Sequence, residues 1–250
     1  MHCPKCGADL QSSLTECPYC GIVFAKYVRR DEPAGVLQGA LSAGFTQEGA
    51  RHDDGVALVL GHEPATVASA VGRAVLLVLL AVWTVSLVSA GVSADRLNGS
   101  FMHLPNLVFH ETGHILWIPF GRFMTVLGGS LTQVLVPLIC AGALLWQTLD
   151  PFGAAVAVWW AGESLLDVAP YINDARDLKL VLLGGKTGAE VEGHDWEYLL
   201  NAMGIANQDH FIASTVQAIG ALTMIAALVW GAFVVAYQFG QRRGNLAPTG

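Results

Sequence analysis

The hydrophobic and polar positions of this chain fall into long blocks. Three stretches, 74–94, 123–149 and 211–241, carry no Asp, Glu, Lys or Arg and are 21, 27 and 31 residues long. A helix needs about 20 apolar residues to cross the hydrocarbon core of a bilayer. The pattern therefore predicts an all-α polytopic membrane protein, and it excludes a soluble monomer, a coiled coil and a disordered chain.

We expect about five membrane spans, at 72–94, 104–121, 125–149, 151–172 and 211–239. Orientation follows from lysine and arginine, which stay on the cytosolic side of a span. The amino terminus is placed in the cytosol by Lys5, Lys26, Arg29, Arg30, Arg51 and Arg73. Five crossings then leave Arg242 and Arg243 outside, against that rule. Either the last segment re-enters, one predicted span is not a full crossing, or the tail is an exception.

The segments outside the apolar blocks are polar, and they divide the chain into four parts. We expect a cysteine-rich head at 1–26, a polar linker at 27–66, the membrane domain at 67–240 and a tail at 241–250. Charged residues make up 13% of the chain, about half of the usual share. With so few basic residues there is no stripe to follow a nucleic-acid backbone, so no nucleic-acid partner is expected. No cleavable signal peptide is visible.

Four of the five cysteines form two CxxC pairs of the form Cys-Pro-x-Cys-Gly: Cys3 with Cys6, and Cys17 with Cys20. Two such turns supply the four thiolates that Zn²⁺ binds tetrahedrally. A head without a signal peptide stays in the reducing cytosol, where disulfides are rare. We therefore expect a structural zinc site, and the segment resembles the short zinc ribbons of many bacterial proteins. Cys140 lies alone in an apolar run and is expected to be a buried small hydrophobe.

The predicted second span contains His110-Glu111-Thr112-Gly113-His114, an HExxH pattern. Residues i and i+4 share a helix face, so both imidazoles can bind one metal ion, with Glu111 beside them to act on a metal-bound water. Ionisable groups in a membrane span are costly and normally mark a functional site. The alternative is that the two histidines only hydrogen-bond to neighbouring spans.

A catalytic zinc ion normally has three protein ligands and one open position. The fourth predicted span and the loop after it offer Asp167, Asp174, Asp177, His194 and Asp195 as the third ligand. Depth along the helices slightly favours Asp167 over Asp174. His194 and Asp195 are candidates for an alternative ligand, or for a pair just outside the ligands. In a second interpretation, one of them caps a helix over 196–203.

These motifs resemble the site-2 protease family of intramembrane zinc metalloproteases over about residues 101–177. After HExxH comes a spacer span with Gly-Gly-Ser at 128–130 and Gln133, and then an aspartate at the end of a later span. That family carries Asn-x-x-Pro followed by Asp-Gly, and its aspartate is the third zinc ligand. Here Asp167 stands at the asparagine position, Pro170 matches, and Asp174 falls one residue early and without the glycine.

The resemblance implies a zinc metalloendopeptidase in which His110, His114 and Asp174 bind the catalytic zinc and Glu111 is the base, with Asp167 and His194 as alternative ligands. The chain would hold two zinc ions, one catalytic and one structural. We expect it in the inner membrane of a bacterium, with a membrane-protein or peptide substrate and a cytosolic protein partner for the zinc ribbon. Gln133 and Asn173 are candidate aids to substrate binding.

Two other functions remain open at this point. One is a non-catalytic zinc-binding membrane scaffold, and the other is a divalent-metal transporter. Transport needs polar groups along several successive spans, and the predicted third and fifth spans are nearly devoid of them. The transporter is therefore the weakest of the three hypotheses.

Overall fold

The computed structural model describes residues 3, 16–20, 55, 58–61, 66–92 and 99–246, in two compact units, Met1–Ala50 and Arg51–Gly250. Most of the predicted linker, the end of the tail and Cys6 lie outside the described residues. Within the described ranges the second unit is helical, with one isolated β-bridge between Val181 and Thr187 and no sheet. The prediction of an all-α membrane domain is confirmed at this level.

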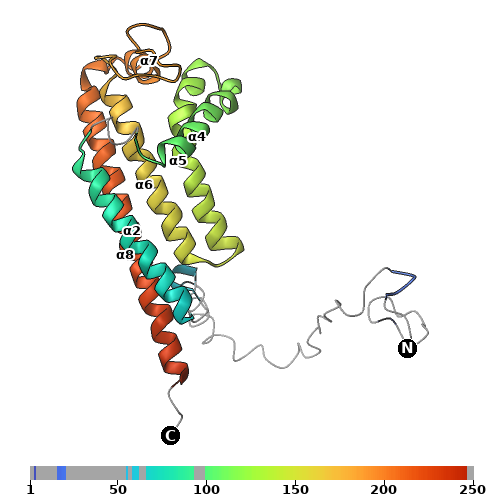
Figure 1. The fold of residues 1–250 in the computed structure, drawn as a ribbon. Helices are drawn as coiled ribbons and strands as arrows, with labels where there is room; N and C mark the ends of the chain where they lie inside the picture. Colours follow the sequence, from blue (N-terminus) through green and yellow to red (C-terminus); the bar gives the residue numbers. More distant parts are fainter. Residues whose placement is uncertain are drawn as a thin grey trace, which may run out of the picture. The chain divides into compact units, whose positions relative to one another are not determined.

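Four of the described helices are long and apolar enough to cross a membrane. They are α2 (Val67–Ser89), α5 (Arg122–Gln147), α6 (Pro151–Asn173) and α8 (Asp209–Leu246). Figure 1 shows them as a bundle of long, roughly aligned helices. This arrangement supports the assignment of the chain to the membrane proteins.

The predicted count of five spans is wrong at the second one. The segment 104–121 forms α4 (His103–Leu116), a helix of 14 residues, which rises about 21 Å and is shorter than the roughly 30 Å hydrocarbon core. The helix ends because Pro119 lies in the short 3-10 turn η2 (Ile118–Phe120), and Gly121 then adopts a positive φ of 88° before α5 begins. A positive φ is accessible to glycine at little cost.

α6 is the central helix, and small residues bring α8 close to it. A Cβ atom at Gly162 would lie 2.7 Å from the carbonyl oxygen of Gly220. On another side of α6, Trp159 donates from Nε1 to Thr84 Oγ1 of α2 at 2.8 Å. Close backbone approach through small residues and hydrogen bonds between helices are the usual means of packing in membranes.

Both ends of the helical unit lie at one end of the bundle. Arg73 near the start of α2 hydrogen-bonds to Gln238 near the end of α8, and it lies 4.0 Å from Asp150, between α5 and α6. α4 and the short helix α7 (Asp195–Ala202) lie at the opposite end (Figure 1). Four crossings therefore return Arg242 to the side from which α2 starts. This removes the conflict with the basic residues of the tail that five spans created.

Candidate metal centre

α4 presents the two histidines of HExxH toward the bundle. His110 is buried and His114 is half-buried, and their ring centroids lie 4.9 Å apart. This pairing follows from the helical periodicity, because residues four apart lie one turn above each other. The local part of the site is thus set by α4 alone.

A hydrogen bond on the Nδ1 side holds each imidazole. Nδ1 of His110 lies 3.0 Å from Oε1 of Gln133. Nδ1 of His114 lies 2.9 Å from the carbonyl oxygen of Thr125. The Gln133 amide is oriented, because its Nε2 donates to Asp167 Oδ2 at 3.0 Å and its oxygen is left for His110. Both partners are acceptors, so each Nδ1 carries the proton and each Nε2 keeps its lone pair.

Asp195 completes the cluster. Its Oδ2 lies 3.0 Å from Nε2 of His110 and 3.3 Å from Nε2 of His114, and the three ligand atoms lie within 4.8 Å of one another. Lone pairs that converge in this way need a proton or a cation among them. Burial, the largest single influence, would raise the pKa of Asp195, but a proton at Nε2 of His110 or His114 hydrogen-bonds to the carboxylate and holds this pKa below its ordinary value.

Two contacts place Asp195 at the start of α7. Its backbone N–H donates to the hydroxyl of Tyr171 on α6 at 3.0 Å. The next residue, Trp196, donates from Nε1 to Ser130 Oγ on α5 at 3.1 Å. The loop after α6 therefore folds back over the bundle and delivers a carboxylate to α4.

His194 is the N-cap of α7, which agrees with the helix-capping interpretation of the sequence. Its Nδ1 accepts the backbone N–H of Glu197 at 3.1 Å, and its ring packs against Tyr171 with centroids 4.4 Å apart. Burial lowers the pKa of His194 and favours the neutral ring. His194 is therefore outside the cluster and orients the residue that follows it.

Glycines make the space for the cluster between α4 and α5. A Cβ atom at Gly113 would lie 2.1 Å from the carbonyl oxygen of Gly128. A Cβ atom at Gly129 would lie 2.6 Å from His110 Nε2 and 2.7 Å from His114 Nε2. In a close-packed interior neither position has room for a methyl group. The Gly-Gly-Ser spacer thus leaves both Nε2 atoms accessible and supplies the serine that holds Trp196.

The other predicted carboxylates are placed elsewhere. Asp174, which the resemblance favours, accepts the backbone N–H groups of Lys179 and Leu180 at 2.9 and 2.8 Å. It stabilises the turn after α6 and is not part of the histidine cluster. Asp167 is also outside the cluster, and Asp177 forms an exposed ion pair with Lys179. As the structure places these residues, Asp195 takes the position expected for Asp174.

A cavity of about 760 Å³ adjoins the cluster. Its wall includes both histidines, Asp195, and Leu180 to Gly185 from the loop after α6. Glu111 also lines it and is exposed, and its side chain makes no hydrogen bond or ion pair with any residue in the described ranges. Asn173, a predicted aid to substrate binding, instead accepts a hydrogen bond from His210 at 2.8 Å and is not in this wall.

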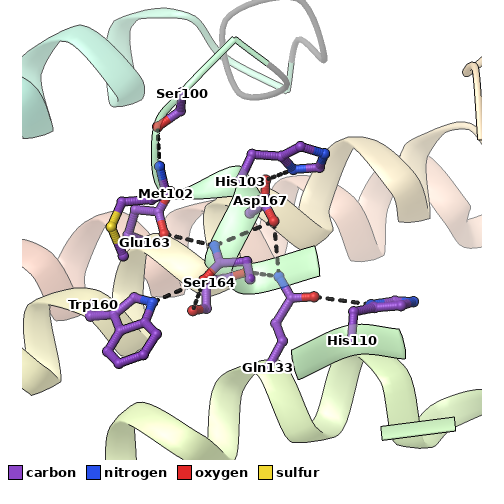
Figure 2. Close-up of polar contacts among 10 residues, drawn as sticks. Ser100, Met102, His103, His110, Gln133, Trp160, Glu163, Ser164 and Asp167 are labelled. Atoms are coloured by element: carbon purple, nitrogen blue, oxygen red, sulfur yellow. Dashed lines mark hydrogen bonds and ion pairs between the residues drawn. The ribbon is translucent and has the colours of Figure 1, made fainter. Parts of the chain in front are cut away.

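A buried polar network continues from the cluster into the bundle (Figure 2). Its members are His103, Asn106, Gln133, Trp160, Glu163, Ser164 and Asp167. Figure 2 shows Gln133 between Asp167 and His110, so the network ends on a member of the cluster. Gln133, expected to contact the substrate, is buried and orients His110.

The cysteine-rich unit holds a second group of metal-binding residue types. The sulfur atoms of Cys3, Cys17 and Cys20 lie within 4.8 Å of one another. Those of Cys3 and Cys20 are 3.6 Å apart, well beyond the S–S bond length of about 2.05 Å. The predicted fourth ligand, Cys6, lies outside the described residues. The geometry fits part of a tetrahedral thiolate site. Cys140, expected to be buried, is only partly so, in an apolar cluster with Ala141.

Comparisons of the chain with protein-family models, with curated proteins and with solved structures find no match. The resemblance to site-2 proteases therefore depends on the motifs and on the cluster described here.

The sequence carries signals for parts of the site beyond HExxH. His103 precedes His110 by seven residues, which is two helical turns and one face. The adjacent glycines 128 and 129 indicate a close helix–helix approach. Asp195 was only one of several candidates, because its position depends on the path of a long loop. Thr125 acts through its backbone carbonyl, which leaves no trace in the sequence.

Proposed function

We propose that this chain is an intramembrane zinc hydrolase of peptide bonds, with His110, His114 and Asp195 as zinc ligands. The proposal is based on the convergence of two Nε2 atoms and one carboxylate, with each ring held by a hydrogen bond at its Nδ1. Two imidazoles and one carboxylate form a ligand set that zinc hydrolases use, with one position left for water. The resemblance of the HExxH region to site-2 proteases supports a peptide substrate within the membrane.

Glu111 is the proposed general base. A zinc ion bound here would supply a Lewis acid and lower the pKa of water to about 7. The Glu111 carboxylate lines the cavity beside His110 and is not engaged by any described residue. It would accept a proton from the attacking water and later return it to the leaving amine.

The cavity fits an unwound segment of substrate. The carbonyl groups of a membrane helix are hydrogen-bonded within the helix, so a segment must unwind before it is cleaved. The volume of about 760 Å³ lies within the range typical of ligand-binding clefts. We therefore propose that the substrate is a membrane protein that presents an extended segment to α4.

The test of this function is Glu111→Gln. We expect it to retain zinc, because the ligands are intact, and to lose cleavage of co-expressed membrane proteins by about a hundredfold or more. Metal content of the purified protein and immunoblots of fragments measure the two quantities. The matched control is Glu190→Gln, since Glu190 only closes a turn with Thr187. Unchanged cleavage by Glu111→Gln would remove it as the base. Zinc binding without cleavage by the parent protein would favour the scaffold.

A further inference from the structure

His103 is a third imidazole in the wall of the cavity that also contains the HExxH side chains. It begins α4, and its seven-residue separation from His110 places both on one face of the helix. Its side chain is 29% exposed. The proposed hydrolysis uses His110, His114 and Glu111, and it gives His103 no task.

Asp167 holds the His103 ring in one orientation. Nδ1 of His103 lies 2.8 Å from Asp167 Oδ1. The other carboxylate oxygen of Asp167 accepts from Gln133 Nε2 at 3.0 Å and from Asn106 Nδ2 at 3.3 Å. The Nδ1 proton of His103 is thus directed at Asp167. Nε2 of His103 has no hydrogen-bond partner among the residues that the structure describes.

The groups behind Asp167 are unusually buried for polar side chains. Asn106 and Glu163 are fully buried, Gln133 is 2% exposed, and the Asp167 side chain is 6% exposed. Polar groups of this kind are costly within a membrane bundle and usually mark functional sites. The network orients two rings on the cavity wall, those of His110 and His103 (Figure 2). The His110 ring belongs to the cluster, but the His103 ring does not, so its fixed orientation needs a separate explanation.

Distance excludes His103 from proton transfer at the cluster. Seven residues of α-helix rise roughly 10.5 Å, whereas a general acid or base must come within about 3.2 Å of the atom on which it acts. An extended peptide advances roughly 3.3 Å per residue. The spacing between His103 and His110 therefore corresponds to about three residues of extended substrate.

We propose that His103 is a substrate-binding residue whose Nε2 hydrogen-bonds to the backbone of an extended peptide, about three residues from the bond held at the metal. A neutral ring accepts a peptide N–H and a charged ring donates to a peptide C=O. An extended backbone offers both groups, so the contact forms in either state. This inference rests on the proposed function, and it adds to it a requirement for substrate length on one side of the cleaved bond.

Peptide hydroxamates test the inference without turnover. The full-length protein is loaded with Co²⁺, and visible absorption reports ligand binding at the His110 site. The probes are acetohydroxamate, which reaches only the metal, and two series of peptides with one to four residues, extended on either side of the hydroxamate. We expect affinity to increase when one series reaches its third or fourth residue. His103→Ala should remove about three- to tenfold of that gain and leave acetohydroxamate binding within about twofold.

Two further variants separate binding from structure. His103→Gln keeps both a donor and an acceptor and should recover part of the gain. His210→Ala is the matched control, because His210 lies outside the cavity wall. A length dependence that His103→Ala leaves unchanged would overturn the inference, as would an equal loss for acetohydroxamate and the long peptides. An absorption spectrum that His110→Ala leaves unaltered would overturn the proposed metal site, and the inference with it.

Discussion

The proposed binding of a metal ion by the cluster depends on single residues behind the two imidazoles. Gln133 and the Thr125 carbonyl accept the Nδ1 protons, and in doing so direct both Nε2 lone pairs at Asp195. Partners of this kind typically contribute ten- to a hundredfold to metal affinity, because they fix the tautomer and the ring orientation. The cluster is thus oriented before any ion binds.

The first prediction at this scale identifies the third ligand. Asp195→Asn should lower zinc affinity at the His110 site by more than tenfold, because a neutral amide replaces the only carboxylate in the cluster. Asp174→Asn should change it by less than about threefold, because Asp174 closes the turn at Lys179 and Leu180. Competition with a chelator measures both values. A larger loss for Asp174→Asn would restore the ligand that the resemblance favours.

How far sequence determines the site differs from residue to residue. His110, Glu111 and His114 are predictable, because their relative positions follow from one helix. Asp195 is not, because it reaches the cluster only after the loop from Asp174 folds back, and no periodicity encodes that path. The match at Asp167 and Pro170 led to the prediction of a metal ligand near the end of α6. In the structure, Asp167 instead holds the ring of His103.

At the scale of elements, α4 is amphipathic, with apolar side chains outward and polar side chains toward the bundle. Its outward side chains Leu104, Val108, Ile115 and Leu116 are each at least 60% exposed, while His110 and the polar residues face the bundle. The apolar composition of 104–121 therefore resembles that of a membrane span. The only signals in the sequence for the end of the helix at Leu116 are Pro119 and Gly121. α4 is best described as a helix too short to cross the bilayer, which lies against α5.

A prediction for this element concerns Gly113. In Gly113→Ala the new Cβ atom would lie 2.1 Å from the Gly128 carbonyl oxygen, so α4 must move away from α5. Overpacking of this kind costs about 1–3 kcal/mol or more, and the movement would also separate the two histidines from Asp195. We expect a lower melting temperature in detergent and reduced zinc content.

Thr112→Ala is the control for Gly113→Ala, because Thr112 is exposed on the same helix turn and bonds only to the Val108 carbonyl. It should retain zinc and change stability only slightly. Equal zinc content in Gly113→Ala and Thr112→Ala would show that the close approach of α4 and α5 is not needed for the site.

At the scale of the whole helical unit, the four-span arrangement separates the cavity from the start of α2 and the end of α8. The basic residues of the loops no longer select an orientation. Arg73, Arg242 and Arg243 lie near the start of α2 and the end of α8, whereas Arg122, Arg176, Lys179 and Lys186 belong to the side of the cavity. The orientation then depends on the predicted zinc site of the cysteine-rich head, because a site of four thiolates is favoured in a reducing compartment. On this argument the cavity opens on the side of the membrane away from the cytosol.

This orientation is tested with two epitope tags in the same protein. One is inserted between Gly184 and Gly185, in an exposed turn where a Cβ atom on either glycine would meet no other atom within 4 Å. The other follows Gly250. In intact spheroplasts an antibody should reach the tag at Gly184, and it should reach the tag at Gly250 only after permeabilisation; a cytosolic marker controls for leakage. If both tags react on the same side, α8 does not cross the membrane, and the four-span bundle is wrong. If they react on opposite sides in the reverse order, one of two statements is wrong: either 104–121 is a fifth crossing, or the head lies outside the reducing compartment that its predicted zinc site requires.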